Sequence, residues 1–196
     1  MPVDLGTVAV YCGSNPGADP AFAERTRELA RLLASSGIRV VFGGGRVGLM
    51  GVLADAAMEA GGEVIGVMPQ ALVDREIGHA GLSELRVVGS MHERKAVMAE
   101  LADAFVALPG GIGTLEELIE VYTWSQLGLH RKPMGVLNVG GYYDPLARML
   151  DHAVAEGFLR QTHRDAMHFA ATPQELLDLF EGWEPEYLSK WMDRDA

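Results

Sequence analysis

Three glycines and a threonine stand between two apolar segments, and a carboxylate follows close behind. Residues 104–108 have the length and composition of a strand, and residues 115–127 are long and apolar enough for a helix. A strand that turns through glycines into a helix leaves backbone N–H groups pointing at one spot, beside the positive end of the helix dipole. The segment 109–114 therefore predicts an anion site, most simply for a phosphate.

Glu117 is the residue near this site that could do chemistry. A carboxylate can stabilise a cationic reaction centre or activate a water molecule. Thr114 and Glu117 also have the spacing of a capping box, which would contribute about 1 kcal/mol to the helix. Glu116 and Glu120 are typical of an N-terminal helix turn as well. From these residues alone, a catalytic and a capping role for Glu117 both remain open.

Arg94 is a second candidate, because local structure gives no reason for a cation at its position. Ser90 and Glu93 have the pattern of a capping box, so Arg94 falls near the first turn of a helix, where the dipole disfavours positive charge. It shares a stripe with Val97 and Leu101, which should face the sheet. We therefore expect an anionic partner for Arg94. The adjacent lysine carries less information, because a solvated lysine is common.

A further glycine segment occurs at Gly43, Gly45 and Gly48, the spacing of a dinucleotide-binding fingerprint. That fingerprint requires an acidic residue near the end of the next strand, and this chain has Met68 and Pro69 there. Bound NAD is therefore disfavoured. A tight turn that packs a helix on a strand and a contact with another ligand both remain open.

The elements that position these residues alternate along the whole chain. This alternation predicts an α/β fold, a Rossmann-like doubly wound parallel sheet of six or seven strands with helices on both faces. Ligands of such folds bind beyond the carboxyl ends of the strands, where the strand order reverses. We expect strands at 7–12, 39–42, 63–68, 85–88, 104–108, 133–139 and 167–171, an irregular connection at 69–83, and helices at 20–36, 49–60, from 90, 115–127, 144–156 and 173–180.

Three motifs together resemble the LONELY GUY family of cytokinin riboside 5′-monophosphate phosphoribohydrolases, many of which carry the label lysine decarboxylase. Residues 109–117 match its Pro-Gly-Gly-x-Gly-Thr-x-x-Glu signature, residues 90–98 contain its Met-His-x-Arg-Lys block, and residues 43–51 resemble its first glycine loop. The resemblance extends from about Val8 to Glu184. It implies hydrolysis of the N-glycosidic bond of nucleoside 5′-monophosphates, with N6-substituted adenines or AMP as substrate and no cofactor.

The resemblance also implies which residues act. Arg94 and Glu117 would be the reactive pair. Substrate contacts would fall within the three motifs on Gly44, Gly45, Met91, Lys95, Gly110, Gly111, Ile112, Gly113, Thr114, Leu115 and Glu116, and outside them on Ser14, Glu76 and Thr123.

Two other classes of protein stay open. Molybdenum-cofactor carrier proteins have a similar fold and glycine loop without a hydrolytic task. A decarboxylase would need a lysine for pyridoxal phosphate. The chain has only Lys95, Lys132 and Lys190, none of them in a recognisable cofactor context.

Composition limits the remaining partners. At 196 residues and a formal net charge of −11, the chain suits one domain (1–196) that would repel nucleic acid. We expect no secretory signal, no membrane span and no metal site, a cytoplasmic location, and at most partial order in the tail 184–196. The single cysteine, Cys12, is expected to be a small buried apolar residue at the end of a strand.

The helix after the glycine loop is apolar on more than one side. One face can cover the sheet, so the rest needs another cover. We therefore expect a two-fold homodimer through this helix, with Thr123 near the partner subunit. The apolar residues are Leu115, Leu118, Ile119, Val121, Tyr122, Trp124 and Leu127.

Overall fold

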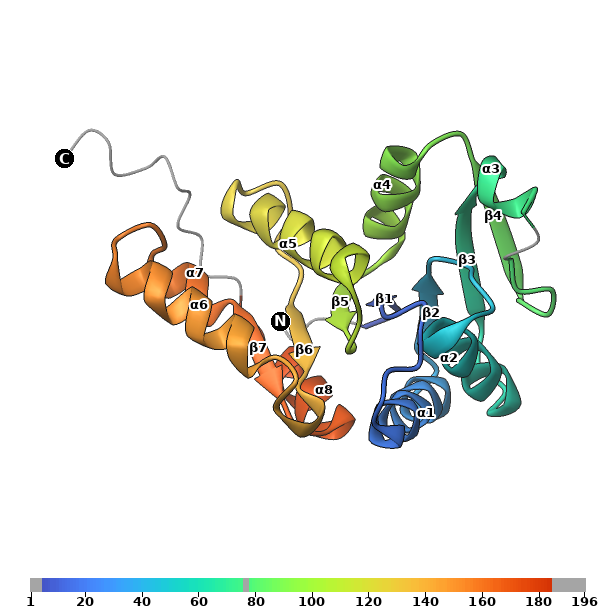
Figure 1. Ribbon diagram of the computed structural model, residues 1–196, viewed down its shortest axis with the longest axis horizontal. Helices are drawn as coiled ribbons and strands as arrows, with labels where there is room; N and C mark the ends of the chain where they lie inside the picture. The colour runs from blue at the N-terminus through green and yellow to red at the C-terminus, as the bar shows by residue number, and fades with distance from the viewer. Residues whose placement is uncertain (1–4, 76–77, 185–196) are drawn as a thin grey trace.

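Seven parallel strands form one twisted sheet in the computed structural model, which describes residues 5–75 and 78–184 (Figure 1). The strand order is β4-β3-β2-β1-β5-β6-β7, and each neighbouring pair is parallel. The strands are β1 (Thr7–Tyr11), β2 (Arg39–Phe42), β3 (Val64–Pro69), β4 (Glu84–Val88), β5 (Ala104–Ala107), β6 (Met134–Leu137) and β7 (Met167–Ala170).

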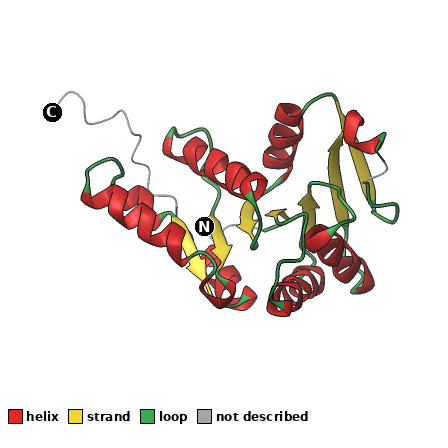
Figure 2. Ribbon diagram, in the orientation of Figure 1, coloured by secondary structure: helices red, strands yellow, loops and turns green. Residues whose placement is uncertain are grey.

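Helices cover both faces of the sheet (Figures 1 and 2). Helices α1, α2 and α8 pack on one face, and α4, α5 and α6 on the other. Their bounds are α1 (Pro20–Ser35), α2 (Gly48–Glu59), α3 (Gln70–Val73), α4 (Met91–Leu101), α5 (Ile112–Gln126), the short 3-10 helix η1 (Val139–Gly141), α6 (Asp144–Ala155), α7 (Gln161–Asp165) and α8 (Pro173–Glu181).

The central strand β1 shows why this sequence forms a two-sided sheet. Val8 and Val10 pack into the cluster shared with α1 and α2, whereas Ala9 and Tyr11 pack into the cluster on the opposite face. All five β1 residues are buried. A strand covered on both faces is rich in apolar residues along its length, as Val8 to Tyr11 are here, because burial on both faces disfavours polar side chains.

The strand order reverses between β1 and β5, which are adjacent in the sheet and far apart in sequence. The loops that leave these two strands therefore diverge toward opposite faces and leave room at the carboxyl edge of the sheet. The segments after β1, β2 and β5 all contain glycines. The candidate residues of α4 and α5 lie at the same edge.

The predicted fold class is confirmed, and most element ends agree with the prediction within two residues. Two predictions were wrong. The connection 69–83 contains the helix α3, and α5 begins at Ile112 instead of Leu115. Helix α7 and η1 were not predicted, and the predicted sixth strand ends early, at Leu137, because the backbone leaves the extended conformation at Asn138 and η1 begins at Val139. The predicted partial order of the tail 184–196 stays untested, because residues 185–196 lie outside the described part.

Candidate active site

The three glycine segments meet at the carboxyl edge of the sheet. The Gly13 N–H, just after β1, donates to the Pro109 carbonyl at 3.1 Å, and the Leu49 N–H of α2 donates to the Gly13 carbonyl at 3.0 Å. A side chain at Gly48 could not be accommodated, since a Cβ there would lie 2.3 Å from the Ser14 carbonyl carbon. The turn that holds α2 on the sheet thus explains Gly48 by packing alone.

The N-terminus of α5 opens directly from the glycine loop. Gly111 is its N-cap residue, and none of the described side chains caps it. Thr114 lies buried inside the first turn, so the prediction that it caps the helix was wrong. Its hydroxyl is packed so closely on the loop that a Cβ at Gly110 would lie 2.1 Å from it. The first N–H groups of α5 are therefore available to an anion.

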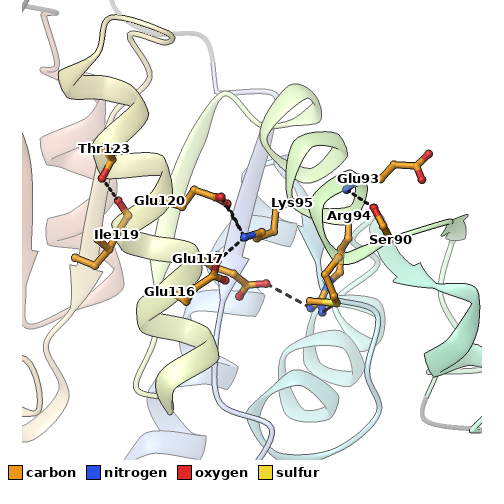
Figure 3. A network of polar contacts seen from close by, with 10 residues as sticks. Ser90, Glu93, Arg94, Lys95, Glu116, Glu117, Ile119, Glu120 and Thr123 are labelled. Atoms are coloured by element: carbon orange, nitrogen blue, oxygen red, sulfur yellow. Dashed lines mark hydrogen bonds and ion pairs between the residues drawn. The ribbon is translucent and has the colours of Figure 1, made fainter.

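Glu117 lies one turn into α5 on the side that faces the sheet, and it is buried. Since Thr114 is not the cap residue, the capping-box interpretation of Glu117 was wrong. Its Oε1 instead lies 3.5 Å from Nη2 of Arg94, across the interface between α4 and α5 (Figure 3). The prediction that Arg94 has an anionic partner is confirmed.

Burial sets the protonation behaviour of this pair. Removal from water raises the pKa of Glu117, and the positive charge of Arg94 lowers it; the net effect is a pKa above the ordinary value of 4.5. A carboxylate with a raised pKa is a better base and a better electrostatic partner for a developing cation than a solvated one.

Arg94 stands in the second turn of α4, which Ser90 caps by accepting from the Glu93 N–H at 3.1 Å. The Glu93 carboxylate accepts from the N–H of Gly89 at 2.7 Å, one residue before the cap. Nη1 of Arg94 lies 3.7 Å from the sulfur of Met91. The buried Nε of Arg94 has no hydrogen-bond partner among the described residues. A buried donor without a protein partner is suited to donate to a ligand.

Gly43 makes room for Arg94, a role that its sequence pattern does not reveal. A Cβ at Gly43 would lie 1.8 Å from Nη2 of Arg94. Gly44 has a φ of 75° and accepts from the His79 N–H at 2.9 Å, and Gly45 forms a bridge with Gly78. The only sequence signal for Gly43 is a run of three glycines after a strand, which does not say what approaches it.

Lys95 differs most from the expectation of a solvated side chain. It is buried, and its ammonium donates to Glu116 and, at 3.1 Å, to Glu120 (Figure 3). Burial lowers the pKa of Lys95, but the hydrogen bonds to both carboxylates raise it by more. The three charges tie α4 to α5 beside the Arg94–Glu117 pair. Glu116 and Glu120 thus pair with a cation instead of serving only the helix dipole.

The remaining predicted contacts divide into two groups. Ser14, Ile112 and Gly113 are exposed around the start of α5 or the end of β1, and Leu115 is half-buried in the first turns of α5. Thr123 is exposed two turns farther along α5, where its hydroxyl donates to Ile119, away from Glu117 (Figure 3). Glu76 lies outside the described residues.

Cys12 is buried, as expected, and burial together with the charge of Glu117 raises the pKa of its thiol. It is therefore a neutral packing residue and not a thiolate nucleophile. Within residues 5–75 and 78–184, no three His, Cys, Asp or Glu side chains are grouped to hold a metal ion. The described part of the chain also has no helix with the length and apolar character needed to cross a bilayer.

Comparison with known proteins gives consistent matches over most of the chain. A family model described as possible lysine decarboxylase matches residues 50–180. A probable cytokinin riboside 5′-monophosphate phosphoribohydrolase from Oryza sativa subsp. japonica is 50% identical over 173 residues, which cover 88% of this chain and 78% of the relative. A cytokinin riboside 5′-monophosphate phosphoribohydrolase from Arabidopsis thaliana is 48% identical over 180 residues, 92% of this chain and 83% of the relative.

Solved structures share the fold at lower identity. The molybdenum cofactor binding protein from Rippkaea orientalis matches with a TM-score of 0.68 and 20% identity, over 90% of this chain and 95% of that one. At this identity the likeness concerns the fold alone.

Proposed function

The chain belongs to the family of cytokinin riboside 5′-monophosphate phosphoribohydrolases, and on this premise we propose that it hydrolyses the N-glycosidic bond of N6-substituted adenosine 5′-monophosphates. AMP would be the simpler substrate. Water would replace the base at C1′, giving the free adenine and ribose 5-phosphate. The observation that carries this proposal is the buried Arg94–Glu117 pair beside the uncapped start of α5.

The phosphate supplies the binding energy in this scheme. It would lie against the N–H groups of Gly111, Ile112 and Gly113, where the dipole of α5 favours negative charge. Binding at this remote group fixes C1′ in the site, so part of the phosphate interaction appears as turnover. We also propose that Ser14 and Gly44 contact the bound nucleotide.

Glu117 would act at the sugar. Departure of the base leaves an oxocarbenium-like centre, as at other glycosidic bonds. A buried carboxylate stabilises that charge strongly because little water competes with it. The same carboxylate would orient and deprotonate the attacking water, and its raised pKa suits that task.

Arg94 would position groups and donate no proton. A guanidinium keeps its proton in proteins, which makes it a poor general acid. Its contact with Glu117 orients the carboxylate, and its Nε, which has no partner within residues 5–75 and 78–184, would donate to a sugar hydroxyl or the base.

The two rival classes have less support. A carrier of the same fold has no use for a buried arginine–glutamate pair at the edge of the sheet. A decarboxylase would need a free lysine, but Lys95 donates to two carboxylates and Lys132 donates to the Ala99 carbonyl at 2.8 Å. Lys190 lies outside the described residues.

We also propose a homodimer through α5 and a reducing, cytoplasmic location. The solvent-facing side of α5 carries Ile112, Ile119 and Leu127 at helical spacing. Thr123 lies on the same stripe, so a partner subunit there would bring it near a bound nucleotide. The free thiol of Cys12 suits a reducing compartment.

Release of base from nucleotides tests the function. AMP and N6-substituted AMP should yield free base and ribose 5-phosphate, measured by chromatography. Adenosine should be a very poor substrate in turnover as well as in KM, because it lacks the phosphate. Equal catalytic efficiency on adenosine and AMP would contradict the phosphate site, and no base release from any nucleotide would contradict the enzyme.

Glu117→Gln tests whether the negative charge of Glu117 is needed, because glutamine removes the charge but keeps a hydrogen-bond acceptor. Turnover should fall by roughly 10²–10⁴, the range for losing a positioned acid or base. Glutamine still accepts a hydrogen bond, and the N–H groups that would hold the phosphate are unchanged. AMP binding, measured by calorimetry, should therefore persist. Glu100→Gln, an exposed change on α4, is the matched control and should retain full turnover. Near wild-type turnover of Glu117→Gln would exclude Glu117 as the reactive carboxylate.

A further inference from the structure

Residues 108–111 form the loop that would hold the phosphate, and each of their four carbonyl groups accepts a hydrogen bond, either from outside the loop or from α5. The Leu108 carbonyl accepts from the Tyr143 hydroxyl at 2.7 Å, and the Gly110 carbonyl accepts from the Tyr142 hydroxyl. Between them, the Pro109 carbonyl accepts from Gly13 at 3.1 Å. The carbonyl of Gly111 accepts from the Leu115 N–H at 3.1 Å, the first bond of α5.

This arrangement also fixes the N–H groups. The described chain contains no cis peptide, and in a trans peptide the C=O and the N–H of the next residue point in opposite directions. The hydroxyl that holds the Gly110 carbonyl therefore keeps the Gly111 N–H turned away from Tyr142. Gly110 and Gly111 have no Cβ to restrict rotation. A peptide that rotated here would present its carbonyl dipole to the phosphate, which is repulsive.

Tyr142 is itself held in place. Its ring contacts Phe22 edge-on at 5.7 Å between centroids and Tyr143 edge-on at 5.0 Å. The turn between β6 and α6 is closed by Asn138, whose side chain accepts from the Tyr143 N–H and donates to Asp144, both at 2.7 Å. The hydroxyl of Tyr142 thus reaches Gly110 from a braced turn and not from a free side chain.

We propose that Tyr142 is a positioning residue for the substrate phosphate, which orients the Gly110–Gly111 peptide so that the Gly111 N–H donates to a phosphate monoester. This role deepens the proposed function and rests on it. It assigns a task to the β6–α6 turn, which the three motifs do not include. Tyr143, fully buried, holds the start of the loop at Leu108.

The effect of Tyr142→Phe should be confined to ligands that carry a phosphate. Phenylalanine keeps the ring contacts with Phe22 and Tyr143 and removes only the hydroxyl. The dissociation constant of ribose 5-phosphate, measured by calorimetry, should rise by roughly fivefold to twentyfold, because the hydrogen bond from the Gly111 N–H to the charged phosphate is weakened but not abolished. KM for AMP should rise by a similar factor, with a smaller change in kcat.

Tyr122→Phe is the matched control, because its hydroxyl donates to the His163 carbonyl at 2.8 Å, away from the loop. It should bind ribose 5-phosphate as the wild type does. Binding of free adenine, which lacks the phosphate, should be the same in both variants. A merely structural role for Tyr142 would weaken adenine and ribose 5-phosphate alike, and that result would overturn the inference.

The two proposals can fail separately. If the wild type releases adenine from AMP while Tyr142→Phe binds ribose 5-phosphate unchanged, the role of Tyr142 is refuted and the proposed function stands. If the wild type releases no base, the hydrolytic function is refuted, and the ribose 5-phosphate titration still decides whether Tyr142 orients a phosphate site.

Discussion

Glu117 is a charge placed where folding alone would not put it. Its pKa is raised by burial in spite of Arg94, from an ordinary value of 4.5. Because this pKa is higher in the folded chain than in the unfolded one, the contribution of Glu117 to stability is complete below about pH 4.5 and is lost as the pH rises through the folded value. At neutral pH the ionised carboxylate therefore costs stability, as expected for a residue kept for chemistry.

Charges from two elements, α4 and α5, act on Glu117. Burial has the largest effect on its pKa, followed by Arg94 and then by Glu116, Lys95 and Glu120. Tyr11, the last residue of β1, and Cys12, which follows it, also interact with Glu117, and both have pKa values raised mainly by their own burial. Lys95 thus offsets the two carboxylates that would otherwise raise the pKa of Glu117 further.

We predict that Lys95→Met moves the acid limb of the pH profile upward. Without the ammonium, Glu116 and Glu120 repel the ionised form of Glu117, which then takes up its proton at higher pH. The apparent pKa of the acid limb of kcat, measured at saturating AMP, should increase by about half a pH unit or more. The phosphate of AMP also titrates in this range, but it contributes equally to both proteins and cancels in the difference.

Two further variants make this result specific. Lys132→Met removes a lysine bound to the Ala99 carbonyl and should leave the acid limb in place. Adding Glu116→Gln to Lys95→Met removes one repelling charge and should move the limb back down. If the apparent pKa of the acid limb were the same in Lys95→Met and the wild type, Lys95 would have no electrostatic influence on Glu117.

At the scale of elements, the loop from β2 to α2 determines whether the guanidinium of Arg94 fits. We predict that Gly43→Ala folds but loses activity, because the added methyl group occupies the place of Nη2. The end of an arginine side chain can move aside, so the fold should tolerate the change. The guanidinium would then leave Glu117, and kcat/KM on AMP should fall by roughly 10², the scale for a misplacement of about 1 Å.

Gly182→Ala is the control for Gly43→Ala. Gly182 ends α8 with an ordinary φ of −82°, and a Cβ there meets its nearest neighbour at 3.7 Å. Both variants should give the same circular dichroism spectrum, and only Gly43→Ala should lose activity. Full activity of Gly43→Ala would show that Arg94 does not need its present position.

The order of strands and helices could be predicted because apolar periodicity is local information. The start of α5 could not, because Gly111 and Gly113 have low helix propensity, and tertiary contacts decide the conformation of the loop. For the same reason, the capping interpretation of Glu117 followed from a spacing that proved to lie wholly inside the helix.

Long-range contacts account for what the sequence could not show at the site. The inward stripe of α4 predicted that Arg94 has an anionic partner, but no local pattern identified Glu117 as that partner. The burial of Lys95 between Glu116 and Glu120 joins residues 21 and 25 positions apart. The hydroxyl of Tyr142 reaches Gly110 across 32 positions. Such pairs depend on the strand order, which a single sequence does not specify.

At the scale of the whole molecule, two properties oppose each other. Each chain has a formal net charge of −11, so two copies repel at a distance. The outer stripe of α5 nevertheless exposes apolar side chains, with Ile112 81%, Ile119 38% and Leu127 38% exposed. Burying this stripe against a second copy would remove it from water, and physiological salt screens the repulsion beyond about 8 Å.

We predict a dimer at micromolar concentration, with a light-scattering mass near twice 21.1 kDa. Ile119→Glu should raise its dissociation constant by roughly 10², since the two-fold axis brings two new carboxylates close together in the interface. Met149→Glu, the same kind of change on the exposed side of α6, should leave the mass unchanged. Higher salt should tighten the wild-type dimer, because it screens like charges. A wild-type mass of 21.1 kDa at every salt concentration would refute the dimer and, with it, any role of Thr123 in the partner's site.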